Sequence, residues 1–148
     1  HFGIGVACNP TAINRDLEFS RWAYKVEMGA DYAVTQPIFD PESFLRWKEC
    51  IAKNYRPQLI GIWPLVSLRN AEFMANEVPG VRVPDWVLQE MARAGDNKEE
   101  AIKRGIEISL KVMDSLSQEV EGFVISAPLG KVPVALTLFN QVKGSLKL

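Results

Sequence analysis

Four short apolar runs, each followed by a stretch with helical features, constrain the fold of this chain more than any other feature. The runs lie at residues 2–7, 32–35, 59–63 and 123–125. Short strands that are apolar throughout are buried on both faces, and their alternation with helices is typical of a parallel sheet covered by helices. The sequence therefore predicts an α/β fold of four βα units.

Capping signals and apolar stripes mark the helices between these runs. Phe19, Trp22 and Val26 recur at steps of three and four residues ahead of Gly29, a residue type that commonly ends helices. Asp40 precedes a proline and a glutamate, which is a strong helix start. Similar signals predict further helices over residues 67–77, 84–94, 97–116 and 133–142. We interpret the aromatic stripes on the first two helices as core rather than as a binding surface.

Two architectures accommodate four βα units: a small doubly wound sheet and half of a (βα)8 TIM barrel. The sequence contains neither a GxGxxG motif nor a P-loop, so the nucleotide-binding versions of the doubly wound sheet are not supported. The chain also opens with His1 and runs at once into the strand-like segment FGIGVAC. We therefore expect one domain, residues 1–148, that is half of a barrel cut from a longer protein.

Composition excludes several classes of function. The net charge is -1 and the pI is about 5.9, so no basic surface for nucleic acid or anionic membrane is expected. No apolar run approaches the roughly 20 residues that span a bilayer. Cys8 and Cys50 form no CxxC pair, which favours two core thiols in a reducing cytoplasm. Because the one histidine is His1, we expect neither a histidine-based zinc site nor a histidine general base.

Ligands of both architectures gather at the carboxyl ends of the parallel strands. The groups predicted at this edge are amides, hydroxyls and one ammonium, which orient a ligand better than they break bonds, so no catalytic residue is predicted in this chain. Gln36 is the strongest candidate for a ligand-binding residue, since the donors and acceptor of a carboxamide match the edge of a pterin or a base. The alternative is a glutamine that satisfies loop backbone groups. The edge is formed by Cys8 and Asn9, Thr35 and Gln36, Trp63 and Pro64, and Ser126 with the loop of Gly130 and Lys131.

A second candidate surface lies on the first helix. Steps of three and four residues put Glu18, Arg21 and Lys25 on one side, with Tyr24 adjacent. Such a face could hold the phosphates and ribose of a nucleotide cofactor, or it could be an ordinary solvated face.

Asn70 and Met74 form a third candidate pair, because residues four apart share a face of a helix. They could present an amide and a soft apolar surface to a ring system. The alternative is an exposed asparagine beside a packed methionine.

Three segments of the chain resemble the methylenetetrahydrofolate reductase family. They are KVEMGADYAVTQPIFD at 25–40, GIWPLVSLRNAEFM at 61–74 and VPDWVLQEM at 83–91. With FGIGVACNP at the start they follow the family's order and approximate spacing, so the resemblance covers nearly the whole chain. The stretch PLVSLRNAEF followed by NEVPG is most similar to bacterial bifunctional proteins, in which a homocysteine S-methyltransferase module precedes the reductase module.

The resemblance implies an FAD-containing (βα)8 barrel that reduces 5,10-methylenetetrahydrofolate to 5-methyltetrahydrofolate with NAD(P)H. It makes this chain the C-terminal half, strands five to eight. Gln36 would hydrogen-bond the pterin, and Asn70 and Met74 would contact folate. Lys131 is a loose substitute for an arginine that follows the last strand of the family, and Asn9 would lie in the loop that touches the flavin.

The resemblance also implies that Glu18, Arg21, Tyr24 and Lys25 hold the phosphates, ribose and adenine of FAD. The family's catalytic carboxylates belong to the other half of the barrel, so we expect this chain to be inactive by itself. Expected partners are folate and either the N-terminal half-barrel or a second copy of the chain. The alternatives are a non-enzymatic (βα)4 module that binds folate or flavin, and a purely structural barrel fragment.

Overall fold

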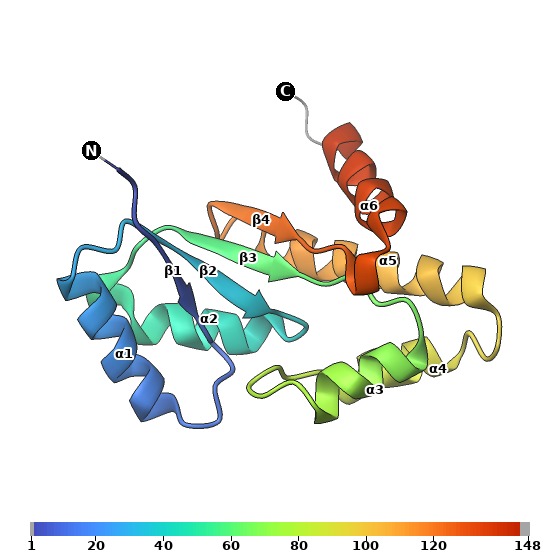
Figure 1. The fold of residues 1–148 in the computed structure, drawn as a ribbon, viewed down its shortest axis with the longest axis horizontal. Coiled ribbons are helices and arrows are strands. Elements are labelled where there is room, and N and C mark those ends of the chain that lie inside the picture. The colour runs from blue at the N-terminus through green and yellow to red at the C-terminus, as the bar shows by residue number, and fades with distance from the viewer. Residues whose placement is uncertain (1, 146–148) are drawn as a thin grey trace.

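The computed structural model describes residues 2–145, in which the strands form one parallel sheet (Figure 1). Neighbouring strands follow one another in sequence order, and every pair is parallel. A doubly wound sheet reverses its strand order at a switch point, whereas a barrel adds its strands in order. The order therefore confirms the α/β half-barrel prediction over the doubly wound alternative. The strands are β1 (Gly5–Cys8), β2 (Tyr32–Pro37), β3 (Gln58–Ile62) and β4 (Gly122–Ile125).

The helices begin where the capping signals predict. The side chains of Asp40, Ser67 and Asn97 each accept a hydrogen bond from a backbone N–H of the first turn. The first strand begins at Gly5 and not at Phe2 as predicted, because the register with β2 starts only at the pair Gly5 and Tyr32. The helices are α1 (Arg15–Glu27), α2 (Pro41–Cys50), α3 (Leu68–Asn76), α4 (Asp85–Ala92), α5 (Lys98–Leu116) and α6 (Val132–Ser145), with 3-10 turns at Ala52–Asn54 and Pro128–Gly130.

One face of the sheet packs against α1, α2, α5 and α6. The aromatic stripes lie in this core: the Phe19 and Trp47 rings stack with centroids 5.2 Å apart, and Trp22 meets Trp47 edge-on at 5.9 Å. Their interpretation as core is therefore confirmed. Alternate strand residues face these helices, so the strands carry a pattern of period two on this side. The strand residues in the core are Cys8, Ala33, Ile60 and Ile62.

A second apolar cluster joins α3 and α4 to the loops after β2 and β3 and to α5. It contains Phe39 and Leu65 from the loops, Met74 and Met91 from the two helices, and Ile108 from α5. In Figure 1, α3 and α4 lie beyond the ends of the strand arrows. Of the helices within residues 2–145, none is long and apolar enough to cross a membrane.

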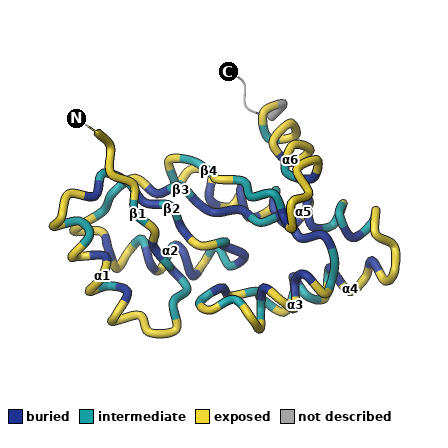
Figure 2. Tube along the Cα trace, in the orientation of Figure 1, coloured by how far each residue is buried: buried dark blue, intermediate teal, exposed yellow. Residues whose placement is uncertain are grey.

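The opposite face of the sheet has no helical cover among the described residues. Gln36 and Val124 are exposed there, and Val34 and Leu59 are half-buried. Figure 2 shows both buried and more exposed residues along the strands, and it shows α6 exposed over much of its length. In a closed barrel this face would form the interior.

Candidate functional site

The carboxyl ends of the four strands meet at one edge of the sheet. The register pairs Cys8 with Thr35 and Ile62 with Ile125, so the loops after the strands follow one another along this edge. Asn9, Gln36, Trp63 and Ser126 therefore lie on the same side of the molecule, as the sequence predicts.

A β-bulge holds the backbone at Gln36. The pairing of β2 with β3 shifts register here, and the Thr35 hydroxyl takes the place of a backbone acceptor. It accepts the Gly61 N–H at 2.9 Å and donates to the Gln36 carbonyl at 2.7 Å. A Cβ at Gly61 would lie 2.7 Å from the Thr35 carbonyl oxygen, so only glycine allows this approach. Bulges of this kind re-aim a side chain next to a site.

The Gln36 side chain itself is exposed and makes no hydrogen bond with any group of residues 2–145. The alternative that Gln36 satisfies loop backbone groups is therefore not what the structure shows. A carboxamide with a fixed backbone and free donors and acceptor is suited to recognise a planar polar edge.

Asn9 is held by two groups from elsewhere in the chain. The Glu18 carboxylate, on a side chain that is 6% exposed, accepts the Asn9 N–H at 2.9 Å. The Asn9 side-chain oxygen accepts the Thr11 N–H at 3.2 Å, and the Thr11 hydroxyl donates to the Gly80 carbonyl. Gly80 has a φ of +75°, and a Cβ there would lie 2.2 Å from the Asn9 amide nitrogen. The loop after α3 thus fixes the loop after β1.

The sequence analysis did not predict the contact between Thr11 and Gly80. The sequence signals at the two ends were only a turn at Asn9, Pro10 and Thr11 and a chain break at Pro79 and Gly80. The contact joins residues 69 apart, and such a pairing leaves no local pattern in one sequence.

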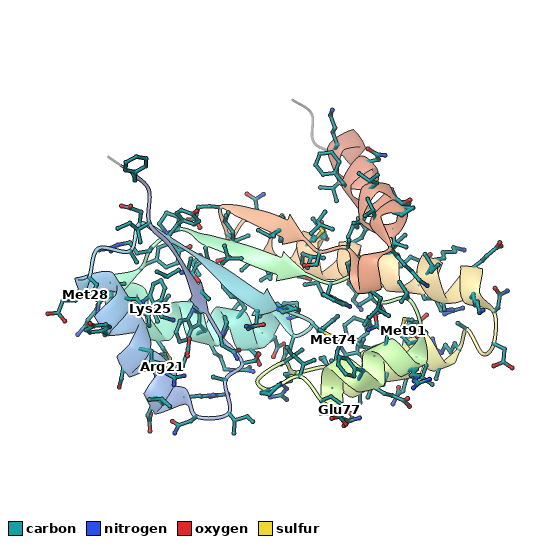
Figure 3. The ribbon with its side chains drawn as sticks, viewed as in Figure 1. Arg21, Lys25, Met28, Met74, Glu77 and Met91 are labelled. Atoms are coloured by element: carbon teal, nitrogen blue, oxygen red, sulfur yellow. The ribbon has the colours of Figure 1, made fainter. Side chains whose placement is uncertain are left out.

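The four residues predicted to share one face of α1 differ in their exposure and in their partners. Glu18 is buried under the loop after β1, whereas Arg21 and Tyr24 are exposed. The Lys25 ammonium donates to the Ala7 carbonyl of β1 at 2.6 Å. Figure 3 shows Arg21 and Lys25 on the helix beside β1. This face therefore offers two cations near the edge of the sheet, one of them already bonded to the strand.

Asn70 and Met74, the third candidate pair, are both buried. Asn70 is 5% exposed and its side-chain oxygen accepts the Trp63 indole N–H at 3.3 Å. Met74 is 3% exposed and packs with Met91, far from Lys25 in Figure 3. Contact of these two with a ligand stays a prediction, and it requires α3 to open. Lys131 is exposed in the loop between β4 and α6.

Cys8 adds no nucleophile to this edge. Burial, reinforced by Glu18 and opposed by Lys25, raises the pKa of the Cys8 thiol to about 12. The thiol donates to the Gln58 side-chain oxygen at 3.3 Å, inside the core. Since the thiolate is the reactive form, this cysteine is structural.

A family model described as methylenetetrahydrofolate reductase matches residues 1–127. The chain belongs to this family. The 5,10-methylenetetrahydrofolate reductase of Escherichia coli strain K12 is 31% identical over 124 residues, which are 80% of this chain and 42% of that protein. Methylenetetrahydrofolate reductase 2 of Schizosaccharomyces pombe is 30% identical over 137 residues, covering 85% of this chain and 21% of the relative. The chain thus spans less than half the length of these relatives.

Solved structures with a similar fold include one that binds a folate. It is an uncharacterized protein from Clostridium thermocellum that binds two copies of 5-methyl-5,6,7,8-tetrahydrofolic acid. It superposes with a TM-score of 0.61 at 17% identity, over 98% of this chain and 55% of that chain. At this identity the likeness concerns the fold. The family match ends at residue 127, so α6 and Lys131 lie outside it.

Proposed function

We propose that this chain is part of a cytoplasmic flavin-dependent oxidoreductase that reduces 5,10-methylenetetrahydrofolate to 5-methyltetrahydrofolate with NAD(P)H. In this proposal residues 1–148 are the C-terminal half of the barrel and supply one side of the folate and FAD sites. Two observations support the proposal. The chain belongs to the family, and the unbonded Gln36 carboxamide lies on a β-bulge that the hydrogen bond between Gly61 and Thr35 holds in place.

Gln36 is the folate-binding residue in this proposal. Its amide can donate to and accept from the edge of the pterin in one plane. The bulge formed by Thr35 and Gly61 keeps the backbone in place, so little conformational freedom is lost when the ligand binds. Asn70 supplies a second amide if α3 moves, because its amide nitrogen has no partner among the described residues.

The residues on α1 fit the charge of FAD. Arg21 is exposed, and Lys25 can turn its ammonium from the Ala7 carbonyl to a phosphate oxygen. Tyr24, 61% exposed, presents a ring on which adenine can stack. Glu18 is occupied with the Asn9 N–H and acts here by holding the loop that would lie against the flavin. The bound flavin would supply hydride transfer, while the residues of this chain bind and orient.

Binding of 5-methyltetrahydrofolate to the purified chain tests the folate part. Calorimetric titration should detect binding that weakens about tenfold in Gln36→Ala, as expected for the loss of two neutral hydrogen bonds. Gln89→Ala, an exposed glutamine on α4, is the matched control and should bind as the parent chain does. Equal affinity of the Gln36 and Gln89 variants would remove Gln36 from the site.

Turnover tests the statement that the chain is inactive by itself. With FAD, NAD(P)H and methylenetetrahydrofolate, the purified chain should oxidise no NAD(P)H above background, because the amides and hydroxyls at its strand ends move no proton at neutral pH. A rate typical of enzymes, about 1 s⁻¹ or more, would contradict this statement. Binding and turnover are separate readouts, so either part can fail without the other.

A non-enzymatic module that binds folate or flavin is the second candidate. The structure favours it in one respect: the described groups at the strand ends orient ligands and include no free carboxylate, since Glu18 is bonded to the Asn9 N–H. Flavin absorbance in the purified chain that bleaches with NAD(P)H would support the reductase. Folate binding without any flavin absorbance would support the module.

A further inference from the structure

Asn9 and Gln36, which the proposed function places against flavin and folate, lie just beyond the paired part of β1 and β2. The two strands are paired as far as Cys8 and Thr35. Beyond this pair, no hydrogen bond or ion pair joins the loop after β1 directly to the loop after β2 within residues 2–145. The pairing of the strands therefore does not by itself fix one ligand-binding position relative to the other.

The connection between α3 and α4 contacts both loops. In Figure 1 it turns back from the end of α3 toward the loop after β1. Three consecutive residues of this connection, Gly80, Val81 and Arg82, are called the strap here. Gly80 is bonded to the loop after β1 and Arg82 to the loop after β2, and Val81 is buried. The strap therefore links two loops that are not bonded to each other.

Gly80 holds the loop after β1. Its carbonyl accepts the Thr11 hydroxyl, and the Thr11 N–H donates to the Asn9 side-chain oxygen at 3.2 Å. The two backbones are so close that a Cβ on Gly80 would lie 2.2 Å from the Asn9 amide nitrogen. The φ of +75° at Gly80 is also one that side chains rarely adopt. The strap therefore fits against Asn9 only with a glycine at position 80.

Val81 and Arg82 hold the loop after β2. Val81 is 7% exposed and lies in the apolar cluster that contains Phe39 of this loop. The Arg82 Nε lies 3.3 Å from a carboxylate oxygen of Asp40, whose side chain is 15% exposed. The same carboxylate caps α2, because it accepts both the N–H and the hydroxyl of Ser43. The strap is thus tied to the start of a helix, a rigid part of the second βα unit.

We propose that the strap positions the two loops relative to each other, so that Asn9 and Gln36 act as parts of one site. Gly80 and Arg82 are positioning residues in this inference, because they act through Thr11 and Asp40. The inference rests on the proposed function only for the ligands given to Asn9 and Gln36. Coupling between two places is reciprocal, so loosening the strap at either loop should also loosen the other loop.

Hydrogen exchange of the purified chain, measured by NMR, tests the link without any ligand. Arg82→Leu breaks the tie to Asp40, yet the Thr11 N–H should exchange about two- to fivefold faster, as expected for the loss of a partly exposed ion pair. The side chain of Arg82 is 60% exposed and Asp40 keeps its bonds to Ser43, so the variant should keep the circular dichroism of the parent chain. Arg82→Lys should restore slow exchange, because an ammonium can pair with the same carboxylate. Arg69→Leu, at an exposed position on α3, is the control and should exchange as the parent chain does.

Thr11→Val tests the link from the other end. It removes the hydroxyl that donates to the Gly80 carbonyl, so the Ser43 N–H, which is bonded to Asp40, should exchange faster. In the double variant this N–H should exchange no faster than in Arg82→Leu, where the link is already cut. Faster exchange only in the loop that each substitution touches would overturn the proposed link. If the exchange rates respond as expected but the chain binds no 5-methyltetrahydrofolate, the proposed function fails and the link stands.

Discussion

Gly105 lies where α5 crosses the loop after β3. Its substitution by alanine tests how closely α5 packs against this loop. A Cβ at this position would lie 1.8 Å from the Leu65 carbonyl oxygen, and ordinary contacts begin at 3.4 Å. The helix and the loop would have to separate by about 1.6 Å. Leu65 is 1% exposed and the clashing atom belongs to the backbone, so no side chain can turn aside.

Two opposing terms decide the sign of the effect. Overpacking a core costs about 1–3 kcal/mol, and a backbone clash belongs at the upper end. Alanine favours a helix over glycine by about 1 kcal/mol. We therefore expect Gly105→Ala to lower the free energy of unfolding by about 2 kcal/mol, which corresponds to a Tm about 4–8 °C lower.

Thermal and urea unfolding followed by circular dichroism measure this change. Lys103→Ala, on the exposed side of α5, is the control and should stay within about 0.5 kcal/mol of the parent chain. A higher Tm for Gly105→Ala would show that helix propensity dominates, and the close contact of α5 with Leu65 would then be wrong.

Three further predictions concern individual side chains. Cys50 is exposed and should react with a thiol reagent in the folded chain, whereas Cys8 should react only on unfolding, as counted by absorbance before and after adding denaturant. Asn97→Ala should lower the free energy of unfolding by about 1 kcal/mol in urea titrations, because two N–H groups of α5 lose their cap. Burial and the hydrogen bond to Glu121 raise the pKa of Tyr55 above its usual value. The stability from this shift is present below about pH 10 and is lost at higher pH, so unfolding midpoints measured against pH should fall less steeply in Tyr55→Phe.

The sequence by itself determined the elements of this fold and their type. Caps such as Asp40 and Asn97 act on the first turn of their own helix, and the stripe of Phe19 and Trp22 is a local period. The apolar runs without polar alternation indicated parallel strands, and parallel strands place their carboxyl ends at one edge. Gln36 could therefore be located at that edge from its position alone.

The tertiary structure decided what each candidate side chain touches. Glu18 and Lys25 share a helix face with Arg21 in sequence, yet Glu18 bonds the Asn9 N–H and Lys25 bonds the Ala7 carbonyl. Their partners are set by how α1 packs on β1, and a helical period carries no such information. Asn70 is buried, where an exposed asparagine was the ordinary expectation. The contact of Thr11 with Gly80 spans 69 residues and depends on the packing of α3 and α4 beyond the strand ends, which a single sequence does not encode locally.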